Sequence, residues 1–359
     1  MDNAIHIEFR HVTKRFGAFK ALDDISLKIP QGCFMTLLGP SGCGKTTLMR
    51  QLAGFSEPDE GDILLYGKRA NGMPPYKRGT PLVFQDYALF PHMTVYENIS
   101  YGLKLGKRPK DEINQKVEDM LTMFNLAGME KRFPHQLSGG QQQRVAFARA
   151  LIMGQQILLL DEPLSNLDAK LRVDVRTELR QIQQRLGITV IYVTHDQDEA
   201  LSMSDLIAVM RAGRIEQLGT PWEIYFRPQN RFVADFVGTV NFLDASVRTC
   251  TEDSVELVWN GHVLFAARRQ GDGFMPGGQA ELVIRPECIS LRPFAADGDY
   301  ALCGTVEFYS FLGRYIRYWV RVGEQSLIID DANPDLNGAL TGEVALTFDS
   351  AKMHLLKKD

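Results

Sequence analysis

The stretch FMTLLGPSGCGKTT, residues 34–47, decides the fold, because a short apolar run leads directly into a Gly-rich loop and then into a helical pattern. Its centre matches the pattern GxxxxGK[ST], between a predicted strand at 34–38 and a predicted helix at 45–53. In that context the glycines let backbone N–H groups approach phosphate, and the helix N-terminus adds a positive dipole end. We therefore expect a nucleotide to be bound by Gly39, Pro40, Ser41, Gly42, Cys43, Gly44, Lys45, Thr46 and Thr47.

A second motif, ILLLDEP at 157–163, places two carboxyl groups at the end of an apolar run. The carboxyl ends of parallel strands are where α/β proteins bind ligands. We expect Lys45 to reach the β- and γ-phosphates, and Thr46 and Asp161 to hold Mg²⁺. Glu162 is then placed to activate the attacking water as a general base. Taken alone, the Asp-Glu pair is equally well explained by a strand that meets its solvated turn.

The order of the predicted elements indicates an α/β fold. Strands are predicted at 5–9, 25–29, 34–38, 157–160 and 188–193. The last two flank a helix predicted at 169–186, and strand, helix, strand is the pattern of a parallel sheet. Helical patterns at 111–127 and 141–153 predict a helical insertion that covers about 87–155.

The pattern changes after residue 238, where long helical stretches give way to short alternating segments. These segments are 254–259, 262–267, 281–284, 304–309, 315–322, 326–329 and 343–348. Asn260-Gly261, between the first two, is a strong hairpin signal, because both residues tolerate a positive φ. We predict two domains, 1–237 and 238–359, the second a small all-β barrel or sandwich.

Composition argues against several classes of protein. The 359 residues carry a net charge of −4, which disfavours nucleic acid as the main ligand. We find no apolar run of the roughly 18 residues that a transmembrane helix needs, and no apolar core of a signal peptide in MDNAIHIEFRHV. The five cysteines include no CxxC pair, so neither a disulfide framework nor a zinc site is expected. Cys43 lies inside the phosphate loop, where we expect alkylation to block nucleotide use. These features predict a soluble, cytoplasmic protein that reaches a membrane only through partners.

Between the two nucleotide motifs lies LSGGQQQR, residues 137–144, which resembles the signature motif of ATP-binding-cassette (ABC) ATPases. Six separated motifs occur in the family's order, and the resemblance covers essentially the whole chain. It implies an α/β P-loop NTPase core with a helical subdomain, followed by an all-β, OB-like (TOBE) domain. By itself, LSGGQ also fits a Gly-rich helix start with Ser138 as its N-cap.

The resemblance implies roles for the remaining motifs. Phe16 in VTKRFG resembles the aromatic residue that stacks on adenine, although its ring also fits a core position. Gln85 in VFQDYALFPHMTVYEN resembles the Q-loop glutamine, which touches Mg²⁺ and the water. Asp168 in SNLD resembles the D-loop aspartate at a dimer interface, and His195 in VTHDQDEA resembles the switch histidine at the γ-phosphate. The expected catalytic residues are Lys45, Gln85, Glu162 and His195.

Members of this family hydrolyse ATP as head-to-tail dimers, in which each ATP lies between one subunit's phosphate loop and the other's signature. The resemblance therefore implies a homodimer whose shared nucleotides are contacted by the signature residues Ser138, Gly139, Gly140 and Gln141. The stretch 85–99 resembles the importer version of the Q-loop region, whose exposed aromatics form a groove for a permease's cytoplasmic helix. The same stretch also fits ordinary packing of the helical insertion.

The C-terminal part resembles the domain found on importer ATPases for sugars, polyamines, ferric iron, sulfate and phosphonates. The stretches that carry this resemblance are FVGTVNFL at 236–243, RPE at 285–287 and YSFLGRYIRYWVRV at 309–322. It implies an ATPase on the cytoplasmic face of the inner membrane, with permease subunits and, indirectly, an extracytoplasmic solute-binding protein as partners. The junction favours a polyamine over ferric iron, aminoethylphosphonate or a sugar as cargo. A soluble ATP-driven clamp without a permease is the alternative class. Whether the C-terminal domain senses a ligand or only dimerises stays open.

Overall fold

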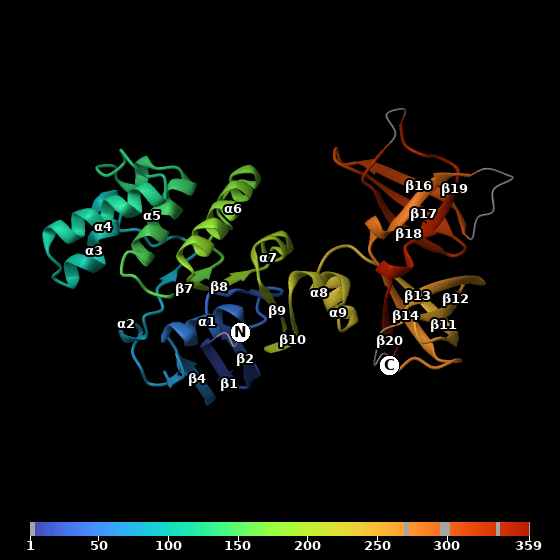
Figure 1. Ribbon diagram of the computed structural model, residues 1–359, viewed down its shortest axis with the longest axis horizontal. Coiled ribbons are helices and arrows are strands. Elements are labelled where there is room, and N and C mark those ends of the chain that lie inside the picture. The colour runs from blue at the N-terminus through green and yellow to red at the C-terminus, as the bar shows by residue number, and fades with distance from the viewer. Residues whose placement is uncertain (1–3, 269–272, 295–301, 335–337, 359) are drawn as a thin grey trace. The chain divides into compact units, whose positions relative to one another are not determined.

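The computed structural model describes residues 4–268, 273–294, 302–334 and 338–358 (Figure 1). Two compact units make up the chain, Met1–Pro221 and Trp222–Asp359. The first contains the predicted α/β core, and the second is dominated by antiparallel strands. Among the described residues, no helix is both long and apolar enough to cross a membrane.

A six-stranded sheet forms the centre of the first unit, in the order β10-β9-β3-β8-β7-β6. Neighbouring strands are parallel except β10, which pairs antiparallel with β9 at the edge. The central strands are buried almost end to end, as expected of strands covered on both faces. The strands are β3 (Phe34–Leu38), β6 (Leu82–Val83), β7 (Ile157–Asp161), β8 (Thr189–Thr194), β9 (Leu206–Arg211) and β10 (Arg214–Gly219).

A second, antiparallel sheet packs against helix α1 (Lys45–Ala53). Its order is β2-β1-β4-β5, and its strands are β1 (Ile5–Phe16), β2 (Phe19–Pro30), β4 (Glu60–Leu65) and β5 (Lys68–Arg69). Leu48 and Leu52 of α1 belong to one buried cluster with Ile7 and Ile25 of this sheet and Met35 of β3. The helix that follows the phosphate loop is therefore buried between the two sheets.

The helices α3 (Val95–Leu105), α4 (Lys110–Met123) and α5 (Gly139–Leu151) lie between β6 and β7 in the chain, on one side in Figure 1. The helix predicted at 111–127 ends at Met123, since Asn125 adopts a positive φ of 53° that breaks the helix. The helix α3 was not predicted, although Thr94 and Glu97 form a capping box at its start. The helices of this unit after α1 are α2 (Pro75–Arg78), α3 (Val95–Leu105), α4 (Lys110–Met123), α5 (Gly139–Leu151), α6 (Ala169–Leu186) and α7 (Gln197–Met203).

The second unit holds two five-stranded antiparallel sheets, β13-β12-β11-β14-β20 and β15-β19-β16-β17-β18. The predicted hairpin joins β12 to β13, with φ of 47° at Asn260 and 81° at Gly261. The strands are β11 (Asn241–Cys250), β12 (Ser254–Trp259), β13 (His262–Ala267), β14 (Gln279–Ile284), β15 (Ile289–Pro293), β16 (Cys303–Phe311), β17 (Ile316–Val322), β18 (Gln325–Asp331), β19 (Glu343–Phe348) and β20 (His354–Lys357).

Two short helices, α8 (Pro221–Phe226) and α9 (Arg231–Phe236), lie between the division of the compact units and the predicted boundary at 237/238. The buried guanidinium of Arg285 explains why they pack with the β sheets. It donates to the carbonyl oxygens of Tyr225 at 3.0 Å, Ala234 at 2.9 Å and Thr239 at 3.1 Å. The compact division therefore falls before α8 is complete, 16 positions ahead of the predicted boundary (237 − 221).

Candidate nucleotide-binding site

The Gly-rich loop after β3 lies so close to neighbouring backbone that two of its glycines have no room for a side chain. A Cβ on Gly39 would lie 2.4 Å from the carbonyl oxygen of Met210, and one on Gly44 would lie 2.5 Å from that of Ala21. Gly44 also has a φ of 109°, which other residues rarely adopt. The loop is therefore held in one shape by β2 and β9 before any phosphate enters it.

Lys45 is buried, and its ammonium group is directed into this loop. Its Nζ donates to the carbonyl oxygens of Gly39 at 2.7 Å and Pro40 at 3.0 Å. Among the described residues, no carboxylate forms an ion pair with it. A buried cation whose hydrogen-bond partners, the two carbonyl oxygens and the Cys43 thiol at 3.9 Å, are neutral is suited to receive an anion, as the motif predicts.

Thr46 and Asp161 are 115 positions apart, but the structure brings them together. The Thr46 hydroxyl donates to Asp161 Oδ1 at 3.1 Å. Burial raises the pKa of the Asp161 carboxyl above its ordinary value. A cation bound nearby would act in the opposite direction and favour the ionised carboxylate. A hydroxyl and one carboxylate are oxygen ligands of the kind that Mg²⁺ uses together with substrate phosphates.

Glu162 and His195 meet at the carboxyl edge of the sheet, with 3.3 Å between Glu162 Oε2 and His195 Nδ1. Glu162 has a positive φ of 45°, an uncommon conformation for a residue with a side chain. Two contacts hold its backbone, because its N–H donates to Val193 O at 3.0 Å and its carbonyl accepts from Ser165 Oγ at 2.9 Å. The strained backbone therefore sets the direction of this carboxylate.

Gln85 and Phe16 are both exposed. Asn166 Nδ2 donates to the backbone oxygen of Gln85 at 2.9 Å, while no hydrogen bond within the described part joins the Gln85 side chain to Thr46 or Asp161. Phe16 is 57% exposed and lines a cavity of about 370 Å³ with Thr47, at the start of α1. The alternative interpretation of Phe16 as a core residue is therefore wrong.

The signature motif forms the start of α5. The Ser138 hydroxyl accepts from Gln141 N at 3.3 Å, and the Gln141 side chain accepts from Ser138 N at 3.0 Å, a complete capping box. Ser138 and Gly139 are exposed. Asp168 caps α6 by accepting from Leu171 N at 2.9 Å. The N-terminus of α5 thus offers exposed backbone that can meet an anion, whereas the N-terminus of α6 already carries the Asp168 carboxylate.

An apolar groove that was not predicted from the sequence lies near the stretch 85–99, where the permease contact was predicted. It is a cavity of about 450 Å³, and its aromatic lining includes Phe55, Tyr76, Phe84 and Tyr101. None of its lining residues lies within 85–99. Part of that stretch is tied to α5, because Arg149 donates to the carbonyls of residues 87 and 88. The groove is marked by exposed aromatic residues from separate segments of the chain. The sequence alone does not show that these residues lie together.

Cys43 is almost fully buried at 2% exposure. Burial raises the pKa of its thiol, which lowers the fraction present as the reactive thiolate. The expectation that an alkylating reagent blocks the site through Cys43 is therefore not supported for the folded chain.

Comparison with known proteins identifies families and relatives that match both parts of the chain. A family model described as "ABC transporter" matches residues 22–165, and one described as "TOBE domain" matches residues 282–356. The chain is similar to the Fe(3+) ions import ATP-binding protein FbpC of Rhizobium etli, with 46% identity over 98% of this chain and 97% of the relative. It is also similar to the spermidine/putrescine import ATP-binding protein PotA of Rubrobacter xylanophilus, with 45% identity over 93% and 88%.

Two solved structures resemble part of the chain. The first is cbiO1 from Clostridium perfringens, part of the ABC transporter complex cbiONQ, with 31% identity and a TM-score of 0.58 over 62% of this chain and 90% of that one. The second is a dimeric ATP-binding cassette in a post-hydrolysis state with ADP and Pi, with 30% identity and a TM-score of 0.53 over 60% and 98%.

Proposed function

The chain belongs to the ABC importer ATPases that carry a C-terminal TOBE domain, and from this premise we propose that it powers the uptake of ferric iron. It binds and hydrolyses ATP, as members of that family do. The support for iron as cargo is the similarity to Fe(3+) import ATP-binding proteins from several bacteria, which are 44–46% identical over 98% of this chain. The sequence-based preference for a polyamine is not confirmed. It remains the second candidate because PotA is similar over almost as much of the chain.

The groups in the site support a division of labour in hydrolysis. The loop N–H groups and Lys45 bind the phosphates, and Thr46 and Asp161 would hold Mg²⁺, which supplies charge neutralisation when bound. Glu162 accepts a proton from the attacking water, while His195, 3.3 Å away, orients that carboxylate and reaches the γ-phosphate. The exposed side chain of Gln85 would contact Mg²⁺ and the attacking water, as the family resemblance implies. The chemistry is phosphoryl transfer to water, so positioning and electrostatics supply most of the catalysis.

A second copy of the chain is the expected partner at the nucleotide. The exposed N-termini of α5 and α6, with Ser138 and Asp168, face outward, where they can serve an ATP held by another copy. We propose that permease subunits at the cytoplasmic face of the inner membrane dock in the groove beside Phe84 and Tyr101, because it offers apolar surface that the chain itself leaves uncovered. An extracytoplasmic solute-binding protein would deliver the cargo.

The cargo is tested with the chain copurified with its permease in lipid vesicles. Candidate receptors are added in turn, loaded with ferric iron, spermidine, aminoethylphosphonate or maltose, and ATP hydrolysis is measured. We expect the iron-loaded receptor to stimulate hydrolysis and the same receptor without iron to have little effect. Stimulation by the spermidine-loaded receptor alone would overturn iron in favour of the second candidate.

A further inference from the structure

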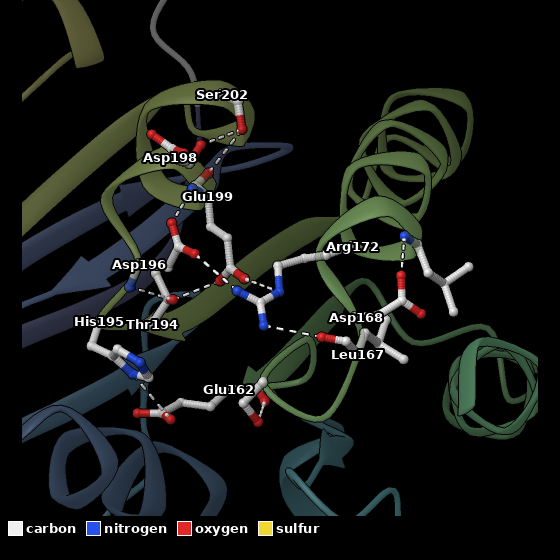
Figure 2. A network of polar contacts seen from close by, with 12 residues as sticks. Glu162, Leu167, Asp168, Arg172, Thr194, His195, Asp196, Asp198, Glu199 and Ser202 are labelled. Carbon is white, nitrogen blue, oxygen red and sulfur yellow. Dashed lines mark hydrogen bonds and ion pairs between the residues drawn. The ribbon is translucent and has the colours of Figure 1, made fainter. Parts of the chain in front are cut away.

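Arg172 joins groups that belong to two different motifs (Figure 2). It lies in the first turn of α6, and its Nη2 donates to the Leu167 carbonyl oxygen at 3.1 Å. Its Nη1 donates to Asp196 Oδ2 at 3.3 Å, and its Nε lies 4.0 Å from Glu199 Oε1. One guanidinium therefore connects the backbone of the SNLD turn to the segment that follows His195.

The groups on the His195 side are themselves fixed to β8. Asp196 caps α7 by accepting from Glu199 N at 3.2 Å. Glu199 is 3% exposed, and its Oε2 accepts from Tyr192 Oη at 2.8 Å and from Thr194 Oγ1 at 2.6 Å. Asp196 and Glu199 therefore tie the guanidinium of Arg172 to the segment that contains His195.

The SNLD turn also packs against the signature motif. A Cβ on Gly139 would lie 3.2 Å from Leu167 Cδ2, and one on Gly140 would lie 3.1 Å from Leu171 Cδ2. These short distances show that the backbone of Gly139 and Gly140 lies directly against the side chains of Leu167 and Leu171, with little room for a side chain at either glycine. Leu167 is also the residue whose carbonyl Arg172 holds.

We propose that Arg172 is a positioning residue that makes hydrolysis at one ATP site depend on the state of the other. The inference rests on the proposed roles, in which His195 faces the ATP of its own phosphate loop and the signature faces the ATP of the second copy. The contacts from His195 through Asp196 and Arg172 to Leu167 and Gly139 connect these two places within one chain. A planar guanidinium suits this position, because it holds several acceptors in fixed directions.

The test compares Arg172→Gln with the wild-type full-length chain in steady-state ATP hydrolysis and nucleotide binding. We expect kcat to fall about tenfold and the Hill coefficient for ATP to fall from about 2 towards 1, while the Kd for ATP changes by less than about twofold. Arg172→Lys, which keeps the charge, should recover part of the loss. Asp196→Asn, which preserves the N-cap of α7, should reduce cooperativity too, and the double variant should be no worse than Arg172→Gln.

Arg180→Gln is the matched control. Arg180 lies on the same helix and pairs with Asp205, which accepts from Phe34 N at 2.8 Å. This variant should lose thermal stability but keep the wild-type Hill coefficient. The inference is overturned if Arg172→Gln keeps wild-type kcat and cooperativity, if it loses ATP binding in parallel with turnover, if Arg180→Gln shows the same kinetic loss, or if the wild type is not cooperative. Glu162→Gln, measured in parallel, tests the proposed general base separately, and the cargo does not enter these assays.

Discussion

At the scale of single residues, the site depends on backbone that is held in uncommon conformations. Gly44 and Glu162 both have positive φ values, of 109° and 45°, and they lie in the two motifs from which a nucleotide site was predicted. Glycine adopts a positive φ readily, whereas for Glu162 this conformation costs free energy, which neighbouring contacts must offset. For Glu162 these contacts are Val193 O and Ser165 Oγ, so the carboxylate is aimed before substrate arrives.

Glu162→Gln should remove the general base while leaving the phosphate-binding groups in place. We expect ATP hydrolysis to fall roughly 100-fold or more, ATP binding to persist, and a stable ATP-bound dimer to accumulate. Turnover and size-exclusion chromatography with ATP measure these effects, and Glu118→Gln on the exposed side of α4 is the control. Hydrolysis by Glu162→Gln at the wild-type rate would show that another group accepts the proton.

The cysteines should differ sharply in reactivity. Cys303 is exposed, whereas burial raises the pKa of Cys288 to about 11 and that of Cys33 to about 12. A maleimide added in slight excess should therefore label Cys303 first and leave ATP hydrolysis unchanged. Peptide mass spectrometry locates the label, and Cys303→Ser should abolish the fast phase. Rapid labelling of Cys43 with loss of activity would restore the earlier expectation.

Glu199 should make stability depend on pH. Burial raises the pKa of its carboxyl above the ordinary value, with Tyr192, Asp196 and Arg172 facing it. The folded pKa exceeds the unfolded one, so the stabilisation is complete below the unfolded pKa and is lost as pH rises through the folded pKa. Urea unfolding at several pH values should show the wild type losing stability relative to Glu199→Gln over that window. A constant difference between them across pH would argue against this titration.

At the scale of elements, two helices carry the same capping box in different surroundings. Ser138 with Gln141 begins α5, and Thr94 with Glu97 begins α3. The α5 box lies in the signature motif, whereas the α3 box lies at the start of a helix packed in the helical region. The pair therefore separates the structural contribution of a cap from its functional contribution.

Ser138→Ala and Thr94→Ala should each lower the free energy of unfolding by about 1 kcal/mol, the usual loss for a helix cap. Only Ser138→Ala should also lower ATP hydrolysis by the isolated chain, because its hydroxyl lies where a second copy's ATP is expected. Chemical denaturation and steady-state turnover of the two variants provide the comparison. Equal activity of the two variants would leave Ser138 with only a capping role.

Local sequence signals predicted some elements well. They failed where the structure depends on contacts between segments that are distant in the sequence. The phosphate loop with its strand and helix, and the Asn260-Gly261 hairpin, were predictable because their signals lie within a few residues. The pairing of Glu162 with His195 follows from the adjacency of β7 and β8, which no local pattern contains. The start of α3 was visible in Thr94 and Glu97, yet the surrounding aromatics favoured a different interpretation.

At the scale of the whole molecule, Arg285 determines to which unit the connecting helices belong. The RPE motif was predicted as a mark of the C-terminal domain, but its arginine turned out to be a buried donor to the carbonyls that end α8 and α9. Burial lowers the pKa of its guanidinium, and the nearby carboxylates of Glu287 and Asp235 act in the opposite direction. The carbonyl oxygens of α8 and α9 replace the hydrogen bonds that the guanidinium would make to water.

Arg285→Met should leave those carbonyls without a donor and release the connecting segment. We expect the free energy of unfolding of the second unit to fall by about 3 kcal/mol, and amide exchange within 222–239 to accelerate, while ATP hydrolysis is retained. Arg248→Met, at an exposed ion pair on β11, is the control. Slow exchange in 222–239 despite the substitution would mean that other contacts hold the helices.

The backbone that holds the phosphate loop in shape is synthesised long after the loop itself, and this has a consequence for folding during synthesis. The loop leaves the ribosome early, but Gly213 N donates to Cys43 O at 3.0 Å, and β3 pairs with β8 and β9, which are made much later. A nascent chain that ends before residue 213 therefore contains the complete nucleotide motif without the backbone that shapes it. ATP should therefore begin to protect the growing polypeptide from proteolysis only after that point.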